Sequence, residues 1–542
     1  MGDRRAAYSA FITTSERYPS NRTTAENKTK HAVEPQKEET MKKLLTMLLC
    51  LAMAMMLAIL PAVAGVAEEQ PKLDYPIDFS EEPYEVHIIM TVQTQVPTQA
   101  GIDRVVEELN KLTLRDLNMT VNLEIMDFSQ FQQNVPLALA SKEKIDLVVL
   151  PFGNGIQMAA AGYLNDLTPL LETYGQHIVG TYTSEALARV CTANGFLFGL
   201  PVHKENCNQM VIVFPTAVLE RNGIDPSEIT DVATMNAAFE KIAANEPGKW
   251  VTTAGKNYGG MFNLHDFSIA GGNYGPCLMD MADSAKVENY YASQEYADYV
   301  KIVREWNQKG WINPAAATDD QYFMTLFAGQ ALSFVFNYNH PLSKPELSQM
   351  LGQDVTMIPL SAQYATTESS AAWNYSIPIG SKQPEKAMMM LDYLMTQKDA
   401  ANLLNWGVEG EDYIVKGDVL DYPEGKDITT VSYHFGQGWI LPNQFVCTPW
   451  INEGADIYER VIDYNKAAKE SLALGFVLDT SNILTELAAV ANVNEEYVNA
   501  LNTGAIDPDE YLPMFLQAQE EAGMQTIIDE IQRQLDAFIA SK

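Results

Sequence analysis

The sequence has few cysteines and few basic residues for its length. Its 542 residues include 5 Cys and no C-x-x-C pair, so the pattern of a zinc or dithiol redox site is missing. Lys and Arg number 36 against 70 Asp and Glu, which gives a formal charge of −34. Because such a chain repels phosphate groups, the composition excludes a basic nucleic-acid binder.

Motifs of common catalytic sites are missing as well. The chain contains no G-x-S-x-G, no H-E-x-x-H and no P-loop, and its 7 His are scattered. Carboxylate pairs are unavoidable in so acidic a chain, so the acid content is no evidence of glycoside cleavage. We therefore expect a protein that is not an enzyme and has no catalytic residue, metal or cofactor. A secreted glycoside hydrolase stays open as an alternative.

Apolar residues are plentiful enough for large cores. Hydrophobic residues make up 47% and aromatic residues 10% of the chain, which excludes a disordered or collagen-like protein. The length suggests roughly two to four domains. The chain holds no short repeat, which argues against solenoids and propellers.

A secretory signal peptide is predicted at 41–67. Lys42 and Lys43 precede an apolar run at 44–60, Pro61 breaks it, and small residues follow. We expect cleavage rather than retention as an anchor. The polar residues 1–40 are expected to be a disordered, non-native extension, with Met41 as the true start. Cys50 follows the bulky Leu49, which is wrong for a lipobox, so we expect an extracytoplasmic protein without a lipid anchor at that position.

Strand and helix patterns alternate after the signal. Strands are predicted at 85–91, 119–126 and 144–150, and helices at 99–117 and 128–142. This order predicts a doubly wound α/β lobe with a parallel sheet. The segment 152–155 is expected to be a loop at the carboxyl end of the third strand, where such sheets bind ligands. Asn154 in that loop is therefore a candidate for ligand contact.

Further elements are predicted along the rest of the chain. Another segment begins at 211–214, a strand is expected at 331–336 and a chain crossing at 373–379, and helices are expected at 233–244, 296–309 and 384–395. The tyrosines between 290 and 299 fall at helical spacing and favour packing over ligand contact. The acidic stretch 507–510 lacks the spacing of a calcium loop and is expected to cap a helix. The compartment allows disulfides among the four cysteines beyond the signal, but their spacing indicates none.

Six motifs occur in order along the exported part of the chain. They are GLP at 199–201, FPTAVLERNGID at 214–225, WNQKGWIN at 306–313, PEKA at 384–387 leading into LDYL at 391–394, NWGVEGEDY at 405–413 and the C-terminal stretch 521–536. Together they resemble the extracellular solute-binding proteins of ABC importers, in particular the oligosaccharide-type lipoproteins with a C-terminal domain of unknown function. The resemblance runs from about Glu85 to Phe538.

The resemblance implies a two-lobed α/β periplasmic-binding-protein fold of type II, with an interlobe cleft and a hinge. The lobes are expected at 68–205 plus 338–373 and at 206–337 plus 374–542, with crossings near 203–211, 336–340 and 373–379. The implied function is capture of a sugar or oligosaccharide by hinge closure, by a monomer that delivers it to permease subunits in the membrane. Oligopeptides or other small organic solutes remain alternative ligands, and surface adhesion remains an alternative function.

A sugar site needs aromatic faces for the C–H surfaces and fixed polar groups for the hydroxyls. Such residues gather at the implied crossings and between residues 437 and 450, and Asn154 could reach the cleft from its loop. The candidate ligand-binding residues are Asn154, Lys204, Glu205, Asn206, Asn337, Tyr338, Trp373, Asn374, Gln437, Trp439 and Trp450. Packing is the alternative role for each Trp. Gly407 and Gly410 directly follow Trp406 and Glu409, which favours a structural loop there.

Overall fold

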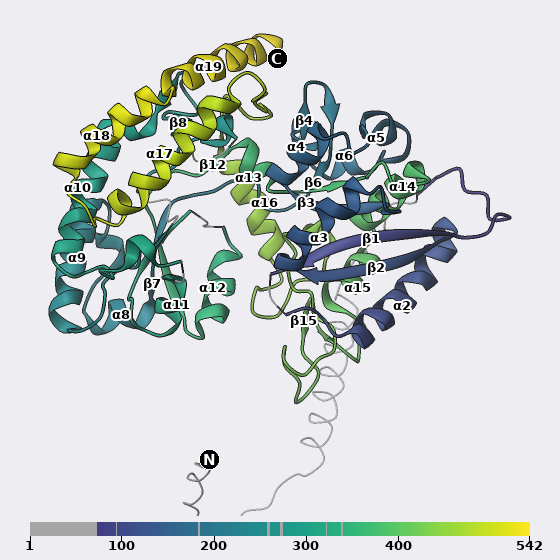
Figure 1. Cartoon of the computed structure of the whole chain (residues 1–542). Coiled ribbons are helices and arrows are strands. Elements are labelled where there is room, and N and C mark those ends of the chain that lie inside the picture. Colours follow the sequence, from purple (N-terminus) through teal and green to yellow (C-terminus); the bar gives the residue numbers. More distant parts are fainter. Residues whose placement is uncertain are drawn as a thin grey trace, which may run out of the picture. The chain divides into compact units, whose positions relative to one another are not determined.

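The computed structural model describes residues 73–93, 95–182, 185–256, 261–271, 275–320, 322–337 and 340–542 (Figure 1). The expected extension at 1–40, the expected signal at 41–67 and the candidate Tyr338 lie outside these residues. Among the helices within them, none has both the length and the apolar character that a membrane crossing requires. The four cysteines beyond the expected signal are buried free thiols.

A five-stranded mixed sheet forms the core of the first lobe. Its strands are β1 (Tyr84–Val92), β2 (Met119–Asp127), β3 (Leu147–Pro151), β6 (Leu200–Pro201) and β13 (Trp373–Ser376), in the order β2-β1-β3-β13-β6. β1 pairs in parallel with β2 and β3, whereas β13 runs antiparallel to β3 and β6. The parallel strands confirm the predicted β-α-β-α-β order.

Both faces of this sheet are buried, as a doubly wound lobe requires. On β1, Ile88 and Met90 join one apolar core, and Ile89 between them joins another. The first core holds α2 (Gln99–Leu117), α14 (Pro384–Thr396) and α15 (Lys398–Trp406), while α3 (Phe128–Ala140) packs in the second. Figure 1 shows α2 lying along β2, and the two elements are in contact. The mostly apolar sequences of β1 and β3 follow from burial on both sides.

A three-stranded antiparallel sheet forms the second lobe. It has the order β10-β7-β11, with β7 (Val211–Pro215) between β10 (Phe334–Phe336) and β11 (Val355–Pro359). Ile212 and Phe214 face the larger core, whereas Val211 and Val213 face a smaller one. Helices of this lobe are α8 (Thr216–Arg221), α9 (Val232–Asn245), α10 (Gln294–Gln308), α11 (Tyr322–Phe327) and α12 (Ser343–Leu351).

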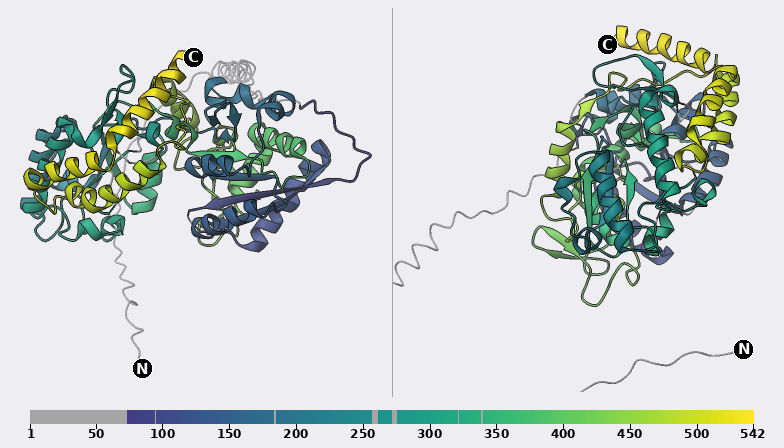
Figure 2. Two further views of the ribbon diagram at one scale, coloured as in Figure 1. Left: turned by 45° about the horizontal axis from the view of Figure 1, so that its top comes forward. Right: turned by 90° about the vertical axis from the view of Figure 1, so that its left-hand side faces the viewer.

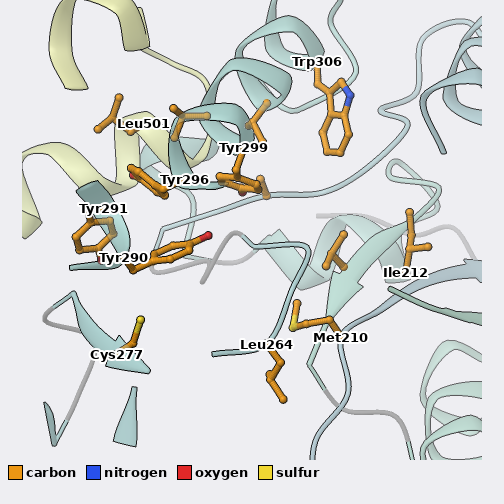
Figure 3. Close-up of a cluster of buried hydrophobic side chains, with 14 of the residues drawn as sticks. Met210, Ile212, Leu264, Cys277, Tyr290, Tyr291, Tyr296, Tyr299, Trp306 and Leu501 are labelled. Carbon is orange, nitrogen blue, oxygen red and sulfur yellow. The ribbon is translucent and has the colours of Figure 1, made fainter. Parts of the chain in front are cut away.

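Three C-terminal helices complete the larger core of the second lobe. They are α17 (Leu484–Asn502), α18 (Pro508–Glu521) and α19 (Met524–Ser541), drawn in light green to yellow in Figure 2. They bury side chains against a set of aromatic rings on and before α10 (Figure 3). Tyr296 is fully buried there, and its hydroxyl donates to Asn502 Oδ1 at 3.0 Å. The expected packing role of these tyrosines is confirmed, and Asp507 caps α18 as expected.

Shorter elements fill the remaining connections. In the first lobe and near it these are α4 (Phe152–Ala160), α5 (Thr168–Tyr174), α6 (Ile178–Thr181), α7 (Glu185–Ala188), β4 (Thr192–Ala193), β5 (Phe196–Leu197), β14 (Ile414–Lys416) and β15 (Val419–Asp421). The others are β8 (Pro276–Leu278), β9 (Val287–Asn289), β12 (Tyr364–Ala365), α13 (Thr367–Ala371), α16 (Ile457–Ala467) and β16 (Lys469–Glu470). The expected loop at 152–155 is wrong, because α4 begins directly after β3.

Within the described residues the chain passes between the two lobes three times, at 203–210, 360–366 and 465–471. Asn208 and Tyr364 exchange backbone hydrogen bonds of 2.9 Å, and β12 pairs in parallel with β16. The first crossing lies where it was expected. The other two expected crossings are wrong: from β10 the chain continues through α12 to β11 in the same lobe, and β13 already belongs to the first sheet. These three adjacent segments form the hinge.

Pairing and packing place two stretches outside the lobes to which the sequence assigned them. The stretch 343–359 lies with the second sheet, because β11 pairs with β7. The stretch 374–447 packs mainly in the first lobe, because α14, α15 and the segment 433–447 share a core with β1 to β3. We therefore propose borders at the three crossings: 73–202 plus 371–450 for the first lobe, and 211–359 plus 471–542 for the second.

Candidate functional site

The carboxyl ends of β1, β2 and β3 meet at one edge of the first sheet, because the three strands are parallel. Phe128 follows β2 directly at this edge, and Gln93 follows β1. Trp373 reaches the same edge from the opposite direction, since antiparallel pairing sets it against Pro151 at the end of β3. The strand register therefore brings together residues from distant parts of the sequence.

Three aromatic side chains form a cluster at this edge, which we call the aromatic platform: Phe128, Trp373 and Trp439. The ring centroids of Trp373 and Trp439 lie 5.8 Å apart, and those of Phe128 and Trp373 lie 5.9 Å apart. Trp373 is buried between its neighbours, whereas Phe128 and Trp439 are half-buried and keep part of their surface accessible. The structure thus unites two of the predicted tryptophans and adds Phe128, which the sequence analysis missed.

Local hydrogen bonds fix the platform. Asp127 caps α3 by accepting from the backbone N–H of Gln130 at 3.0 Å, which starts the helix at Phe128. The turn that carries Trp439 is held by the Tyr375 hydroxyl, which donates to the Ile440 carbonyl at 3.1 Å. An aromatic surface held by such contacts loses little conformational entropy when a ligand stacks on it.

The polar residues predicted to bind ligand near the platform differ in their accessibility to a ligand. Gln437 is buried, and its Oε1 accepts from the Gln93 backbone N–H at 3.1 Å. Asn374 is fully buried and donates to the Leu150 carbonyl at 3.1 Å, which is a bond within the sheet. Asn154 is half-buried in the first turn of α4. Ligand contact by each of these three residues stays a prediction. Because Asn374 is fully buried, it is the least accessible of the three to a ligand.

Lys204 and Glu205 form a buried ion pair in the first crossing. Lys204 Nζ lies 2.5 Å from Glu205 Oε1, and Gln444 Nε2 donates to Glu205 Oε2 at 3.3 Å. Burial raises the pKa of Glu205, but the charge of Lys204, aided by His340 and hydrogen bonds, lowers it to about 2. The pair is therefore charged and internally neutralised, which suits a role in positioning the hinge.

Asn206 and Asn337 lie near the hinge and differ in burial. The Asn206 backbone N–H donates to Asn465 Oδ1 at 3.0 Å, and its side-chain Oδ1 is buried without a hydrogen-bond partner among the described residues. Asn337 is exposed after β10. Direct ligand contact by either residue stays a prediction.

Trp450 lies in a different cluster from the platform. Its ring packs against Trp406, Tyr422 and His434 with centroid distances of 4.9, 4.7 and 4.9 Å, and 6% of the residue is exposed. The Trp406 indole donates to the Thr448 carbonyl at 2.9 Å, and Gly407 adopts a positive φ of 92° that favours glycine. This packing favours a structural role for Trp450 and for the NWGVEGEDY motif.

The described residues offer no group of three or more His, Cys, Asp or Glu side chains placed to hold a metal ion. The polar groups at the platform are amides, and the nearby charges at the hinge are paired. This arrangement can bind a hydroxyl-rich, uncharged molecule by stacking and hydrogen bonding.

Comparisons with known proteins agree with this fold along most of the chain. The sequence pattern of the family described as bacterial extracellular solute-binding protein matches residues 99–401, and that of a domain of unknown function, DUF3502, matches residues 472–540. A carbohydrate ABC transporter substrate-binding protein of Streptococcus pneumoniae serotype 4 is 26% identical over 458 residues, covering 82% of this chain and 89% of the relative.

Solved structures show the same two-lobed fold. An N-glycan transport solute binding protein from Streptococcus pneumoniae matches with a TM-score of 0.76 and 22% identity, over 84% of this chain and 99% of that one. Its complex with Man5GlcNAc matches with a TM-score of 0.66, 23% identity and coverages of 85% and 99%. A solute-binding protein from Bifidobacterium longum infantis, described as binding HMO, matches with a TM-score of 0.59, 14% identity and coverages of 85% and 100%. These likenesses confirm the expected type II fold.

Proposed function

We propose that this chain, which belongs to the family of bacterial extracellular solute-binding proteins, captures a carbohydrate and delivers it to an ABC importer. Family membership implies an extracytoplasmic location. The observation that carries the choice of ligand is the aromatic platform, where Trp373 and Trp439 meet at the carboxyl edge of the first sheet. The names of the relatives, a carbohydrate transporter component and an N-glycan binding protein, support the same choice.

The platform suits the surface of a sugar ring. The C–H faces of a pyranose are apolar and flat enough to stack on half-buried rings such as Trp439 and Phe128. The equatorial hydroxyls need donors and acceptors beside those rings, which Gln93, Gln437 and Asn154 offer from neighbouring loops and from α4. The charged side chains at the hinge are paired with one another, so they leave no unbalanced charge to attract an ionic ligand. A neutral sugar is therefore favoured over a charged peptide or polyamine.

Hinge bending supplies the transport signal in this proposal. A solute that touches both lobes stabilises the closed arrangement by its differential affinity, and the permease distinguishes that arrangement from the open one. The three crossings confine the motion, because Asn208, Tyr364 and Lys469 hold them together through backbone hydrogen bonds. No bond of the solute needs to be broken, so we propose a binding protein rather than a glycoside hydrolase. The permease subunits and a monomeric state belong to the same proposal.

A thermal-shift screen of residues 68–542 against saccharides, oligopeptides and polyamines tests this function. Ligand that binds the folded state raises the melting temperature in proportion to RT ln(1 + [L]/Kd). We expect a rise with one or more oligosaccharides, without release of a shorter sugar on prolonged incubation. A rise with peptides alone would replace the carbohydrate by that solute class, and release of a shorter sugar would favour the hydrolase.

A further inference from the structure

The segment 472–476, which we call the pivot segment, follows the third crossing directly and is held by both lobes. The side chain of Leu474 lies in the first lobe, in the apolar core that also contains Ile89 of β1. Its neighbours Ala473 and Phe476 lie in the larger core of the second lobe. A rotation of one lobe against the other therefore has to be accommodated at or beside these residues.

Hydrogen bonds to both lobes fix the backbone of the pivot segment. Thr367 belongs to α13, the helix that leads from the second crossing into the first lobe. Its hydroxyl donates to the Ala473 carbonyl at 3.1 Å and accepts from the Gly475 backbone N–H at 2.9 Å. On the side of the second lobe, the Leu472 backbone N–H donates to the Met281 carbonyl at 2.8 Å. Successive residues of the segment are thus bound to different lobes.

Side chains from the last turns of α19 hold the pivot segment and the residues just beyond it. Gln534, Phe538 and Lys542 are spaced by four residues, which places them on one face of the helix. Lys542 Nζ donates to the Leu474 carbonyl at 2.9 Å. The Phe538 ring packs edge-on against Phe476, with a centroid distance of 5.6 Å. This face of α19 therefore contacts both the backbone and a side chain of the segment.

The earlier turns of α19 anchor the same face of the helix in the second lobe. Ile527, Ile531 and Leu535 are fully buried in the larger core of that lobe. A close-packed core resists displacement of its members, so α19 moves with the second lobe and carries the pivot segment with it. The sequence pattern of the domain of unknown function, matched at 472–540, begins at the pivot segment and ends in α19. Both partners of this contact therefore belong to one matched unit.

We propose that the domain at 472–540 is a brace of the hinge, in which α19 keeps the pivot segment attached to the second lobe so that the lobes rotate as rigid bodies. The proposal rests on the proposed function, since it concerns a hinge that closes on a solute. A pivot segment released from α19 lets the lobes adopt more arrangements. Closing then costs more conformational entropy, and the affinity for the solute falls with the smaller fraction of binding-competent protein.

Two half-buried glutamines of α19 form a matched pair for the test. Gln534 accepts from the Asp479 backbone N–H at 2.9 Å and donates to the Asp479 carbonyl at 2.8 Å, just beyond the pivot segment. Gln532 accepts from the Val287 backbone N–H at 2.8 Å and donates to the Ala285 carbonyl at 3.1 Å, within the second lobe. Each also donates to an acidic side chain four residues away. Replacement by Ala therefore removes equivalent bonds, but only Gln534→Ala loosens the contact with the hinge.

Distances between two spin labels, measured by pulsed electron paramagnetic resonance, report the arrangement of the lobes in the protein without solute. The labels are attached to Leu137→Cys in the first lobe and Met324→Cys in the second, two positions that are exposed. The four native thiols beyond the expected signal are buried and compete little for the label. Lys542→Ala is a further variant, and because Lys542 is exposed its loss leaves the fold intact. Titration calorimetry with the best solute of the thermal-shift screen gives the affinity of each variant.

We expect Gln534→Ala, and more strongly the double variant with Lys542→Ala, to broaden the distance distribution and to weaken solute binding about threefold. Gln532→Ala is expected to lower the melting temperature as much as Gln534→Ala while leaving the distances and the affinity as in the wild type. Distances unchanged in the Gln534 and Lys542 variants, or broadened equally in Gln532→Ala, would overturn the brace. A wild type that binds no solute would overturn the proposed function instead, and the distances in the solute-free protein would still decide the brace.

Discussion

Arg104 of α2 donates to both carboxylate oxygens of Asp412, at 2.7 and 2.8 Å, and thereby ties the NWGVEGEDY segment to the first lobe. Asp412 is fully buried and also accepts from the backbone N–H groups of Val408 at 3.0 Å and Tyr433 at 3.1 Å. The NWGVEGEDY segment thus owes its shape to one buried carboxylate. This contact supports a structural role for the motif.

Replacing Asp412 with Ala is expected to lower the free energy of unfolding by about 3 kcal/mol, because the Arg104 charge and two buried N–H groups lose their acceptor. Urea unfolding measures this loss. Lys111→Ala is the control, since it removes only exposed ion pairs on the same helix and is expected to cost less than about 1 kcal/mol. An Asp412 variant as stable as the control would contradict the assigned role.

Replacing Trp439 with Ala is expected to weaken binding of the carbohydrate ligand about tenfold, because a ring stack is worth about 1–1.5 kcal/mol. Trp439→Phe is expected to keep most of the affinity, since it preserves an aromatic face. Titration calorimetry with the best ligand of the thermal-shift screen gives both values. The same measurement on Trp373→Ala completes the test, and unchanged affinity in both Ala variants would remove the platform from the site.

Trp450→Ala is expected to change stability and not affinity, in contrast to Trp439→Ala. Because Trp450 packs against Trp406, Tyr422 and His434, its loss is expected to lower stability by about 3–5 kcal/mol while the remaining folded protein binds its ligand normally. A variant of unchanged stability that fails to bind would place Trp450 in the site after all.

Glu346 of α12 makes the folding stability of the protein depend on pH. Burial first, and then the negative charges of Glu205 and Glu453, raise the pKa of Glu346 from its usual 4.5 to about 8. The folded pKa is higher than the unfolded one, so the contribution to stability is fully present below a pH of about 4.5 and is lost as the pH rises through about 8. We expect Glu346→Gln to be more stable than the wild type at pH 8 and equally stable at pH 4.

Urea unfolding at the two pH values measures this difference. Burial also raises the pKa of Glu453, to about 7, but that group remains in both proteins and so does not account for a difference between them. Glu228→Gln on the surface of the second lobe serves as the matched control and is expected to follow the wild type at both pH values. A Glu346 variant that does the same would refute the assignment.

Much of the first lobe could be predicted because its signals are local. The apolar-rich segments 85–91 and 144–150 mark strands whose cores are buried on both faces. The later crossings could not be predicted in this way. β12 and β16 have two residues each, too few to carry a periodic pattern, and only their pairing identifies them.

The candidate site could be predicted only in part, because residue type does not show which segments pack together. Residue type identified Trp373 and Trp439 as possible sugar platforms, but it also identified Trp450, whose neighbours come from distant segments. Phe128 was missed because it appears in the sequence as the first residue of an amphipathic helix. Its position directly after β2, at the carboxyl edge of a parallel sheet, was the signal that could have found it.

The lobes are interleaved along the chain, and this has a consequence for the order of folding. The core of the first lobe needs residues as late as Cys447, and the core of the second combines Met210 with Leu535. The interior of the second lobe cannot be completed while the ribosome still holds the final helix, whereas the interior of the first lobe needs no residue of that helix. Completion of the second lobe is thereby delayed until synthesis of the chain is almost finished.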